Sequence, residues 1–146
     1  MARSNPGNAA RGRSSAATAR MKERDRVTRE KIVSLADDVA RRSLKGVEPT
    51  MNVPTRTRSN TVWNKRKGIL EMGDAKQERQ LFNLNQAKLF MQTVLHSSSI
   101  KELIEAEKTL SLRGMFYKGL HTVAGTKEKT FAGQDETVGI LEDLEV

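Results

Sequence analysis

The chain contains one tyrosine, Tyr117, and an arginine stands four residues before it in the segment SLRGMFYKGL. Residues four apart lie side by side on a helix, so Arg113 and Tyr117 are expected to project together. A phenol is a weak nucleophile at neutral pH unless a cation or a base favours its ionised form. Arg113 could do this and could also neutralise charge on a phosphorus centre under attack. The pair therefore indicates either transesterification through a phosphotyrosine ester or an amphipathic tyrosine at a core edge.

This pair falls on a predicted helix that follows Ser111, a residue type favoured at the N-cap. An earlier helix is expected from residue 85, and Ser99 followed by Glu102 is a capping-box pattern that would open another helix. The order helix, turn, helix predicts a helix-turn-helix, and the polar stretch after it suits a loop or wing. A closing helix is expected near the C-terminus. The expected apolar positions of these helices are Phe90, Met91, Val94, Leu95, Ile100, Leu103, Ile104, Leu112, Met115, Phe116, Leu120, Ile140, Leu141 and Leu144.

The N-terminal third divides into two parts. Residues 1–24 are small, polar and basic, which predicts a disordered tail with the character of either a transit peptide or a phosphate-binding arm. Residues 25–47 are expected to form a helix with Ile32, Leu35, Ala36 and Val39 on one face. Gly46 is the expected C′ residue of that helix. Residues 48–146 would then be the winged-helix domain, which makes the fold mainly α with a small β component.

Residues 48–74 carry two short β-prone patches around the sequence NKRKG, which fit a hairpin or two extended segments. Trp63, the only tryptophan, lies among several cations there. Such a stretch suits either a phosphate or base surface or a loop with solvated charges. The candidate DNA-binding residues are Arg56, Arg58, Lys65, Arg66, Lys67 and, on the later helix, Lys118.

Composition narrows the possible partners and chemistry. Twenty-six basic and 18 acidic residues give a formal charge of +8, which favours a polyanion such as nucleic acid or marks a generic basic protein. The absence of cysteine excludes disulfides and thiolate sites, no apolar run is long enough to span a membrane, and no phosphate loop appears. His96 and His121 are expected at the surface or a core edge. Glu142, Asp143 and Glu145 are expected to form a solvated or salt-bridged face, so no metal site is expected.

The segment SLRGMFYKGLHTVAGTKEKTFAGQDETVGILEDLEV resembles the catalytic region of the A subunit of archaeal DNA topoisomerase VI, a type IIB family related to the meiotic double-strand-break transesterase. Arg113, Phe116 and Tyr117 fall on the family's arginine, first aromatic and nucleophilic tyrosine. Gln134, Glu136 and the run 142–145 match the next part of the family's pattern. The upstream segments VPTRTRSNTVWN and QERQLFNLNQAKLFMQTVL extend the resemblance to about residues 50–146. Gly114 and Thr137–Val138 depart from the family pattern.

The resemblance implies the DNA-cleaving subunit of an ATP-dependent topoisomerase with a CAP-like winged helix. It also implies 5′-phosphotyrosyl links to double-stranded DNA, an A2B2 assembly with an A-subunit homodimer and a B subunit that uses ATP, and a cytoplasmic, nucleoid location. Mg²⁺ would be held by a Toprim domain absent from this chain, so the chain is expected to be incomplete and inactive alone. A non-catalytic winged-helix DNA-binding protein is the alternative.

Overall fold

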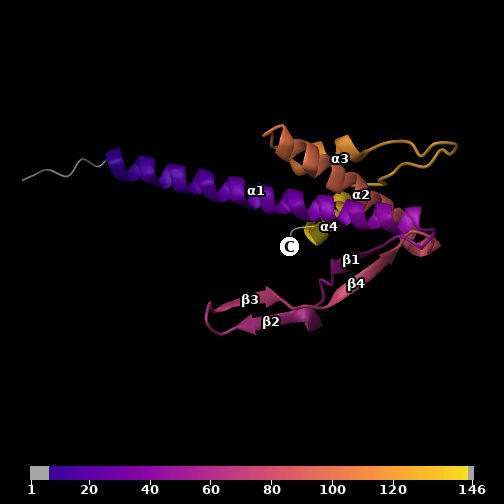
Figure 1. The fold of residues 1–146 in the computed structure, drawn as a ribbon, viewed down its shortest axis with the longest axis horizontal. Helices are drawn as coiled ribbons and strands as arrows, with labels where there is room; N and C mark the ends of the chain where they lie inside the picture. Colours follow the sequence, from indigo (N-terminus) through magenta and orange to yellow (C-terminus); the bar gives the residue numbers. More distant parts are fainter. Residues whose placement is uncertain (1–6, 145–146) are drawn as a thin grey trace, which may run out of the picture.

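The computed structural model describes residues 7–144, with side chains from residue 16 onward. It is mainly helical with two small antiparallel sheets, which confirms the expected fold class at that level. Figure 1 shows the long helix α1 crossing the molecule, with α2 and α3 above its C-terminal half and the strands below it. The helices are α1 (Gly7–Leu44), α2 (Leu84–Glu105), α3 (Leu112–Gly119) and α4 (Gln134–Leu144); the strands are β1 (Thr50–Pro54), β2 (Thr61–Asn64), β3 (Ile69–Met72) and β4 (Lys76–Gln80).

Helix α1 ends as expected but begins earlier. Gly46 has a φ of +68°, its amide donates to Ser43 O, and the Val47 amide donates to Arg42 O, which together form the Schellman motif that stops the helix. The helix starts at Gly7, so residues 7–24, expected to be disordered, are helical in the structure. Alanine and arginine, both strong helix formers, account for much of this segment. Residues 1–6 of the expected tail lie outside the described residues.

The strands form one long antiparallel ribbon in two parts. Of the two expected arrangements around NKRKG, a hairpin or two extended segments, the structure has the hairpin: β2 pairs with β3, with Trp63 opposite Leu70. The pairing of β1 with β4, closer to the helices, was not predicted. Met51 and Val53 of β1 pack with Phe90 of α2 in a small buried cluster, which Leu35, Val39 and Leu81 border. The proximal part of the ribbon is therefore anchored to α1 and α2.

Helix α2 runs without interruption from Leu84 to Glu105, so the predicted break before a second helix at Ser99 is wrong. Asn83 is the true N-cap, because its side chain accepts a hydrogen bond from the Asn85 amide. Ser97 and Ser99 are instead buried within the helix. A capping-box pattern shows only that a helix could start there, and packing on both sides of α2 carries the helix through it.

The buried face of α2 is unusually polar. Gln92, Thr93, His96 and Ser97 are almost fully enclosed, whereas Val94, expected on the apolar face, is exposed. Three of these polar side chains have partners on other elements, in β4, in α4 and in the loop before α4. Helix α2 is thus a central helix that neighbours surround, and a one-sided apolar pattern does not describe it.

None of the helices in the described part of the chain is both long and apolar enough to cross a membrane.

Candidate functional site

The candidate nucleophile, Tyr117, lies on α3, a short helix with a capped N-terminus. The Ser111 hydroxyl accepts a hydrogen bond from the Gly114 amide at 3.1 Å, as expected for an N-cap. Met115 and Gly119 are its buried residues, whereas Leu112, expected in the buried stripe, is exposed. A helix of eight residues buries only a narrow face, and here that face is centred on Met115 and Gly119.

Gly119 lets α3 approach two aromatic rings closely. A Cβ atom there would lie 2.8 Å from Phe131 Cε2 and 2.9 Å from His96 Cε1. His96 and Phe131 stack with ring centroids 4.5 Å apart, and His96 Nε2 lies 3.3 Å from the Thr137 hydroxyl of α4. The expectation that His96 is a surface or edge residue is therefore wrong, because the ring is fully buried. Burial lowers the pKa of His96 below its usual range.

Arg113 and Tyr117 lie side by side on the outer face of α3, as their spacing predicts. Arg113 Nη2 is 3.4 Å from the Tyr117 hydroxyl oxygen, and its Cζ lies 5.7 Å from the centre of the phenol ring. The hydrogen bond to Tyr117 raises the pKa of Arg113, which therefore keeps its charge. Tyr117 is 57% exposed and its ring lies 5.3 Å from that of Phe116. The Tyr117 residue is thus largely exposed to solvent, with a guanidinium beside its hydroxyl.

Gly114, a departure from the family pattern, follows Arg113 in the first turn of α3. A Cβ atom at Gly114 would lie 2.8 Å from Leu110 Cγ and 2.9 Å from its Cδ2. The Leu110 side chain therefore occupies the space that a larger residue would need. A larger residue at this position would have to displace Leu110, which is 45% exposed.

The segment between α3 and α4 is a small β-like turn. Thr122 and Lys129 form an antiparallel bridge, and the Val123 amide donates to Glu128 O at 2.9 Å. Gly125 in the turn has a φ of +77°, a conformation that glycine adopts without strain. The Thr130 hydroxyl donates to Gly119 O at 2.7 Å and so ties the base of the turn to the end of α3.

The candidate DNA-binding cations do not form one surface. Lys118 pairs with Glu102 at 2.7 Å, Lys67 with Glu71 at 2.7 Å, and Arg56 with Asp143 at 4.0 Å. Figure 1 places α3 and the β2–β3 hairpin on opposite sides of α1, so the hairpin cations are remote from Tyr117. The side chains without an ion pair among the described residues are Arg58, Lys65 and Arg66.

A buried ionic network that the sequence analysis did not foresee links α4 to the ribbon. Arg79 of β4 donates to Asp143 of α4 and to the Thr93 hydroxyl of α2, the latter at 2.7 Å. Its side chain is 8% exposed and that of Asp143 is 18% exposed. No signal in the sequence marks this pair, because 64 residues separate its members. Asp143 thus serves as a structural counter-ion, in agreement with the expected salt-bridged acidic face.

Glu136 makes a second link between α4 and α2. Its carboxylate accepts hydrogen bonds from Lys88 Nζ and Gln92 Nε2, both at 2.8 Å, and from the Ala132 amide at 3.0 Å. Burial alone would raise the pKa of Glu136, but these hydrogen bonds outweigh it and leave the pKa below the ordinary value. Glu136, which the family resemblance singled out, therefore fixes the first turn of α4.

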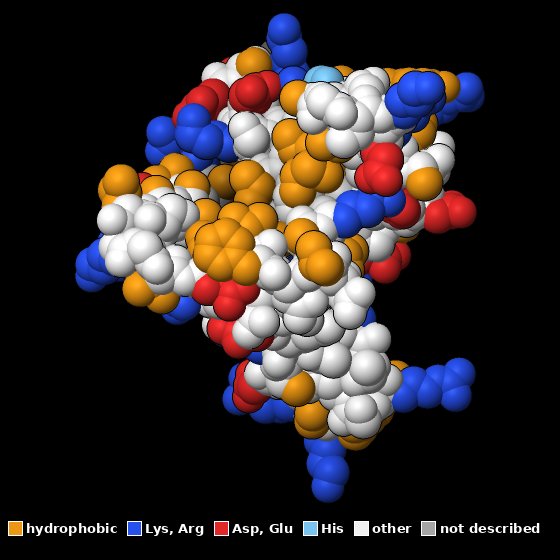
Figure 2. All heavy atoms as spheres, turned by 90° about the vertical axis from the view of Figure 1, so that its right-hand side faces the viewer, with side chains coloured by type: hydrophobic (Ala, Val, Ile, Leu, Met, Phe, Trp, Pro, Cys, Tyr) orange, Lys and Arg blue, Asp and Glu red, His pale blue; other side chains and the backbone are white. Residues whose placement is uncertain are grey.

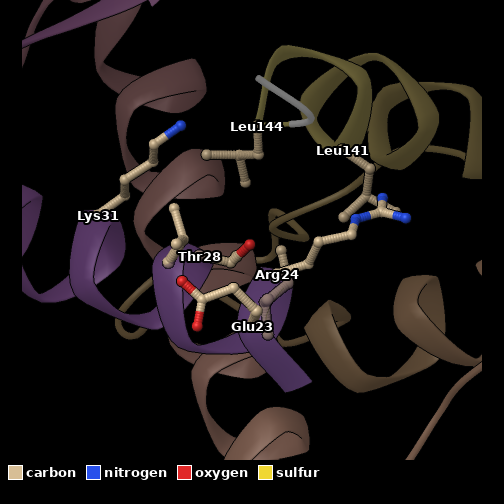
Figure 3. Close-up of a pocket in the computed structure, with 8 residues that line it drawn as sticks. Glu23, Arg24, Thr28, Lys31, Leu141 and Leu144 are labelled. Carbon is tan, nitrogen blue, oxygen red and sulfur yellow. The ribbon is translucent and has the colours of Figure 1, made fainter. Parts of the chain in front are cut away.

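Across residues 7–144, no group of three or more histidine or acidic side chains converges as a metal ion would require. A pocket of about 490 Å³ lies between α1, α2 and α4, and Figure 3 shows Leu141 and Leu144 facing Glu23, Arg24 and Thr28 across it. Neither Arg113 nor Tyr117 lines this pocket. The candidate nucleophile is therefore on an open surface and does not lie at this pocket.

Comparisons with known proteins show what this chain resembles. Residues 88–146, which include α3 and α4, match the family model described as type IIB DNA topoisomerase. The A subunit of type 2 DNA topoisomerase 6 from Pyrococcus horikoshii is 36% identical over 116 residues, which cover 80% of this chain and 30% of that protein. This chain is related to topoisomerase 6 A subunits.

Other topoisomerase 6 A subunits match equally well. That of Aeropyrum pernix is 36% identical over 70% of this chain and 28% of its own length, and that of Pyrococcus abyssi is 34% identical over 80% and 31%. The chain thus spans about a third of the length of these curated relatives. The relatives come from archaea, in agreement with the archaeal family that the sequence resembles.

Proposed function

We propose that this chain is the tyrosine-bearing part of the A subunit of a type IIB topoisomerase and that Tyr117 is the nucleophile that cleaves DNA. The Tyr117 oxygen loses its proton to the solvent and bonds to a backbone phosphorus, while the bond from that phosphorus to the 3′ oxygen breaks. The 3′ oxygen takes up a proton, and the protein is joined to the 5′ end. The reverse reaction reseals the strand without an external energy source, because one phosphoester replaces another.

The single observation that carries the proposal is the exposed pair on α3. Tyr117 is 57% exposed, and Arg113 lies within 3.4 Å of its hydroxyl oxygen with no carboxylate partner found among the described residues. Arg113 can therefore turn its remaining donors toward the oxygens of an approaching phosphate. Lys118 is already paired with Glu102 at 2.7 Å, so Arg113 is the cation available beside Tyr117.

The surroundings of the pair support a winged-helix arrangement. Helices α2 and α3 follow each other across a short turn, and the bridged segment 121–130 stands where a wing would follow the second helix. In such a domain the second helix meets the DNA, and here that helix is α3. We infer that α3 presents Tyr117 to the duplex while the segment 121–130 lies against the backbone beside it.

The remaining parts of the reaction are assigned to other chains or segments. Asp143 is engaged by Arg79, so it is not free to hold Mg²⁺. We propose that Mg²⁺ is bound by a Toprim domain outside this chain, and that a B subunit binds ATP in an A2B2 assembly built on an A-subunit homodimer. The proposed location is the archaeal nucleoid, where double-stranded DNA is the substrate.

The test uses a full-length A subunit that contains this sequence, with its B subunit, ATP and Mg²⁺. Cleavage is read as protein that stays attached to DNA ends in denaturant. The Tyr117→Phe variant, which removes only the hydroxyl, should form no adduct, and Arg113→Gln should form at least tenfold less. Leu112→Gln, at an exposed position on the same helix and outside the motif, is the matched control and should retain the adduct.

Two outcomes would reject the assignment. Adducts that persist in Tyr117→Phe would mean that another residue attacks the DNA. Adducts absent from both the parent enzyme and the variant, with DNA binding retained, would instead favour a non-catalytic winged-helix DNA-binding protein.

A further inference from the structure

The distal part of the ribbon, residues 58–73, projects away from the rest of the molecule and is called the arm below. It comprises the short helix η1 (Arg58–Asn60) and the hairpin of β2 and β3. Figure 1 shows it extending from the end of the β1–β4 pair on the side of α1 opposite α3. An isolated two-stranded hairpin of this length is only marginally stable in water, so a projecting hairpin requires additional contacts that hold it in place.

The base of the arm is held rigidly by one buried side chain. The Asn60 side-chain nitrogen lies 2.8 Å from Thr55 O, 3.1 Å from Ala75 O and 3.2 Å from Gly73 O, and its Oδ1 accepts from the Ala75 amide at 3.0 Å. A Cβ atom at Gly73 would lie 2.5 Å from Asn60 Oδ1, so only glycine fits there without rearrangement. This junction fixes the direction in which the arm leaves the β1–β4 pair.

One face of the arm is apolar and uncovered. In the β2–β3 register Trp63 lies opposite Leu70 and Thr61 opposite Met72, so these side chains share one face. Trp63 is 55% exposed, Leu70 66% and Met72 41%. Exposed aromatic and aliphatic side chains grouped in this way mark an interaction surface rather than a stable free surface.

The charge around this face is positive. Lys65 and Arg66 lie in the turn between the strands, and Arg58 lies at the base, none with an ion pair among the described residues. Glu71, the acid within the hairpin, is neutralised by Lys67 at 2.7 Å and accepts from Asn64 at 2.8 Å. The pKa of Glu71 is correspondingly lowered, first by the Lys67 hydrogen bond. Figure 2 shows basic side chains projecting outward at the lower end of the molecule, on the side where the arm lies.

We propose that the arm is a second duplex-DNA contact, separate from the cleavage surface on α3. A two-stranded ribbon fits the major groove of B-DNA, and Lys65, Arg66 and Arg58 would then meet phosphates along its edges. Trp63 and its apolar neighbours would lie against base edges and sugars. The positive turn favours DNA over a protein partner. The inference rests on the proposed function, namely that this chain acts on DNA, and adds a contact remote from Tyr117.

The test exploits the fact that Trp63 is the only tryptophan in the chain. The 146-residue protein is titrated with a short mixed-sequence duplex while tryptophan emission and fluorescence anisotropy of labelled DNA are followed together. If the arm binds DNA, Trp63 emission should change along the same binding curve as the anisotropy. Trp63→Ala should weaken binding by at least about 5-fold, because the apolar surface that the ring buries against the DNA is lost, and Trp63→Phe should largely restore it.

The salt dependence tests the cations. In Lys65→Gln/Arg66→Gln the slope of log K against log salt should become shallower by about 1.8, since each phosphate contact contributes about 0.9. Lys45→Gln/Lys108→Gln removes the same net charge at exposed positions outside the arm and should leave that slope within about 0.5 of the parent protein. Equal slopes for the two double variants would overturn the proposal.

Three further outcomes keep this proposal distinct from cleavage by Tyr117. DNA binding without any change in Trp63 emission rejects the arm contact and leaves the cleavage proposal standing. A Trp63 response in the parent chain, with no covalent adduct formed by the assembled parent enzyme, supports the arm and rejects cleavage. A Trp63 emission that depends on protein concentration without DNA would identify a second copy of the chain as the occupant and overturn the proposal.

Discussion

Removal of one member of the Arg79–Asp143 pair should destabilise this chain strongly. In Asp143→Asn the guanidinium of Arg79, whose side chain is 8% exposed, loses its anionic partner but keeps its hydrogen bond to Thr93. Removing one member of a buried ion pair costs about 3–5 kcal/mol, because the other charge stays buried and uncompensated. The remaining bond to Thr93 and the partial exposure of Asp143 favour a value near 3 kcal/mol, the lower end of that range.

Thermal unfolding followed by circular dichroism measures this loss. For a chain of this size, about 3 kcal/mol corresponds to a fall in Tm of about 6–12 °C. Glu142→Gln alters the exposed neighbour on the same helix and should change stability by no more than about 0.5 kcal/mol. The double variant Arg79→Met/Asp143→Leu removes both charges and should recover most of the loss, since apolar replacement of a whole pair is often neutral.

Two results would refute this reasoning. If Asp143→Asn lowers the Tm no more than Glu142→Gln does, the pair is not a buried structural link. If the double variant is as unstable as Asp143→Asn, the cost does not arise from an uncompensated charge at Arg79. In either case the anchoring of α4 to the ribbon must depend on other contacts.

Three further changes test the packing beneath α3 and at the base of the arm. Gly119→Ala should cost about 1–3 kcal/mol in the free energy of unfolding, measured with urea, because its Cβ would press on His96 and Phe131. Asn60→Ala leaves the Ala75 amide without its acceptor and should cost about 1–3 kcal/mol, with faster hydrogen exchange in the arm than in α2. Burial lowers the pKa of His96 in the folded chain, so as the pH falls the unfolded chain protonates this histidine before the folded chain does. The free energy of unfolding should therefore decrease as the pH drops through 6.5 and below, and His96→Gln should lack this decrease.

Patterns confined to a few neighbouring residues were predicted well. Gly46 was identified as a helix end and Ser111 as an N-cap because each acts on the backbone within one turn of itself. The Arg113–Tyr117 contact follows from helical geometry alone. The hairpin at NKRKG was predicted because two β-prone patches flank a turn-forming sequence.

Features set by distant contacts were not predicted. His96 looked like a surface histidine, and only Phe131 and Thr137, which pack on it from other elements, explain its burial. Strand β4 lacks the apolar alternation that marks a strand with one buried face, because it consists of charged and amide side chains, of which Arg79 is buried. The roles of Tyr117 and of the basic residues stay predictions until the cleavage and binding experiments are done.

The polar interior of α2 determines how accurately α3 can be positioned. Helices joined only by aliphatic side chains can rotate or slide by small amounts at little cost, because such contacts have no direction. Gln92 and Thr93, in contrast, each meet specific distant partners, and a shift of one residue would leave several buried donors and acceptors unpaired. These directional contacts favour one alignment of α2 with α4. Because α3 packs on both helices, its outward-facing phenol is held in one orientation.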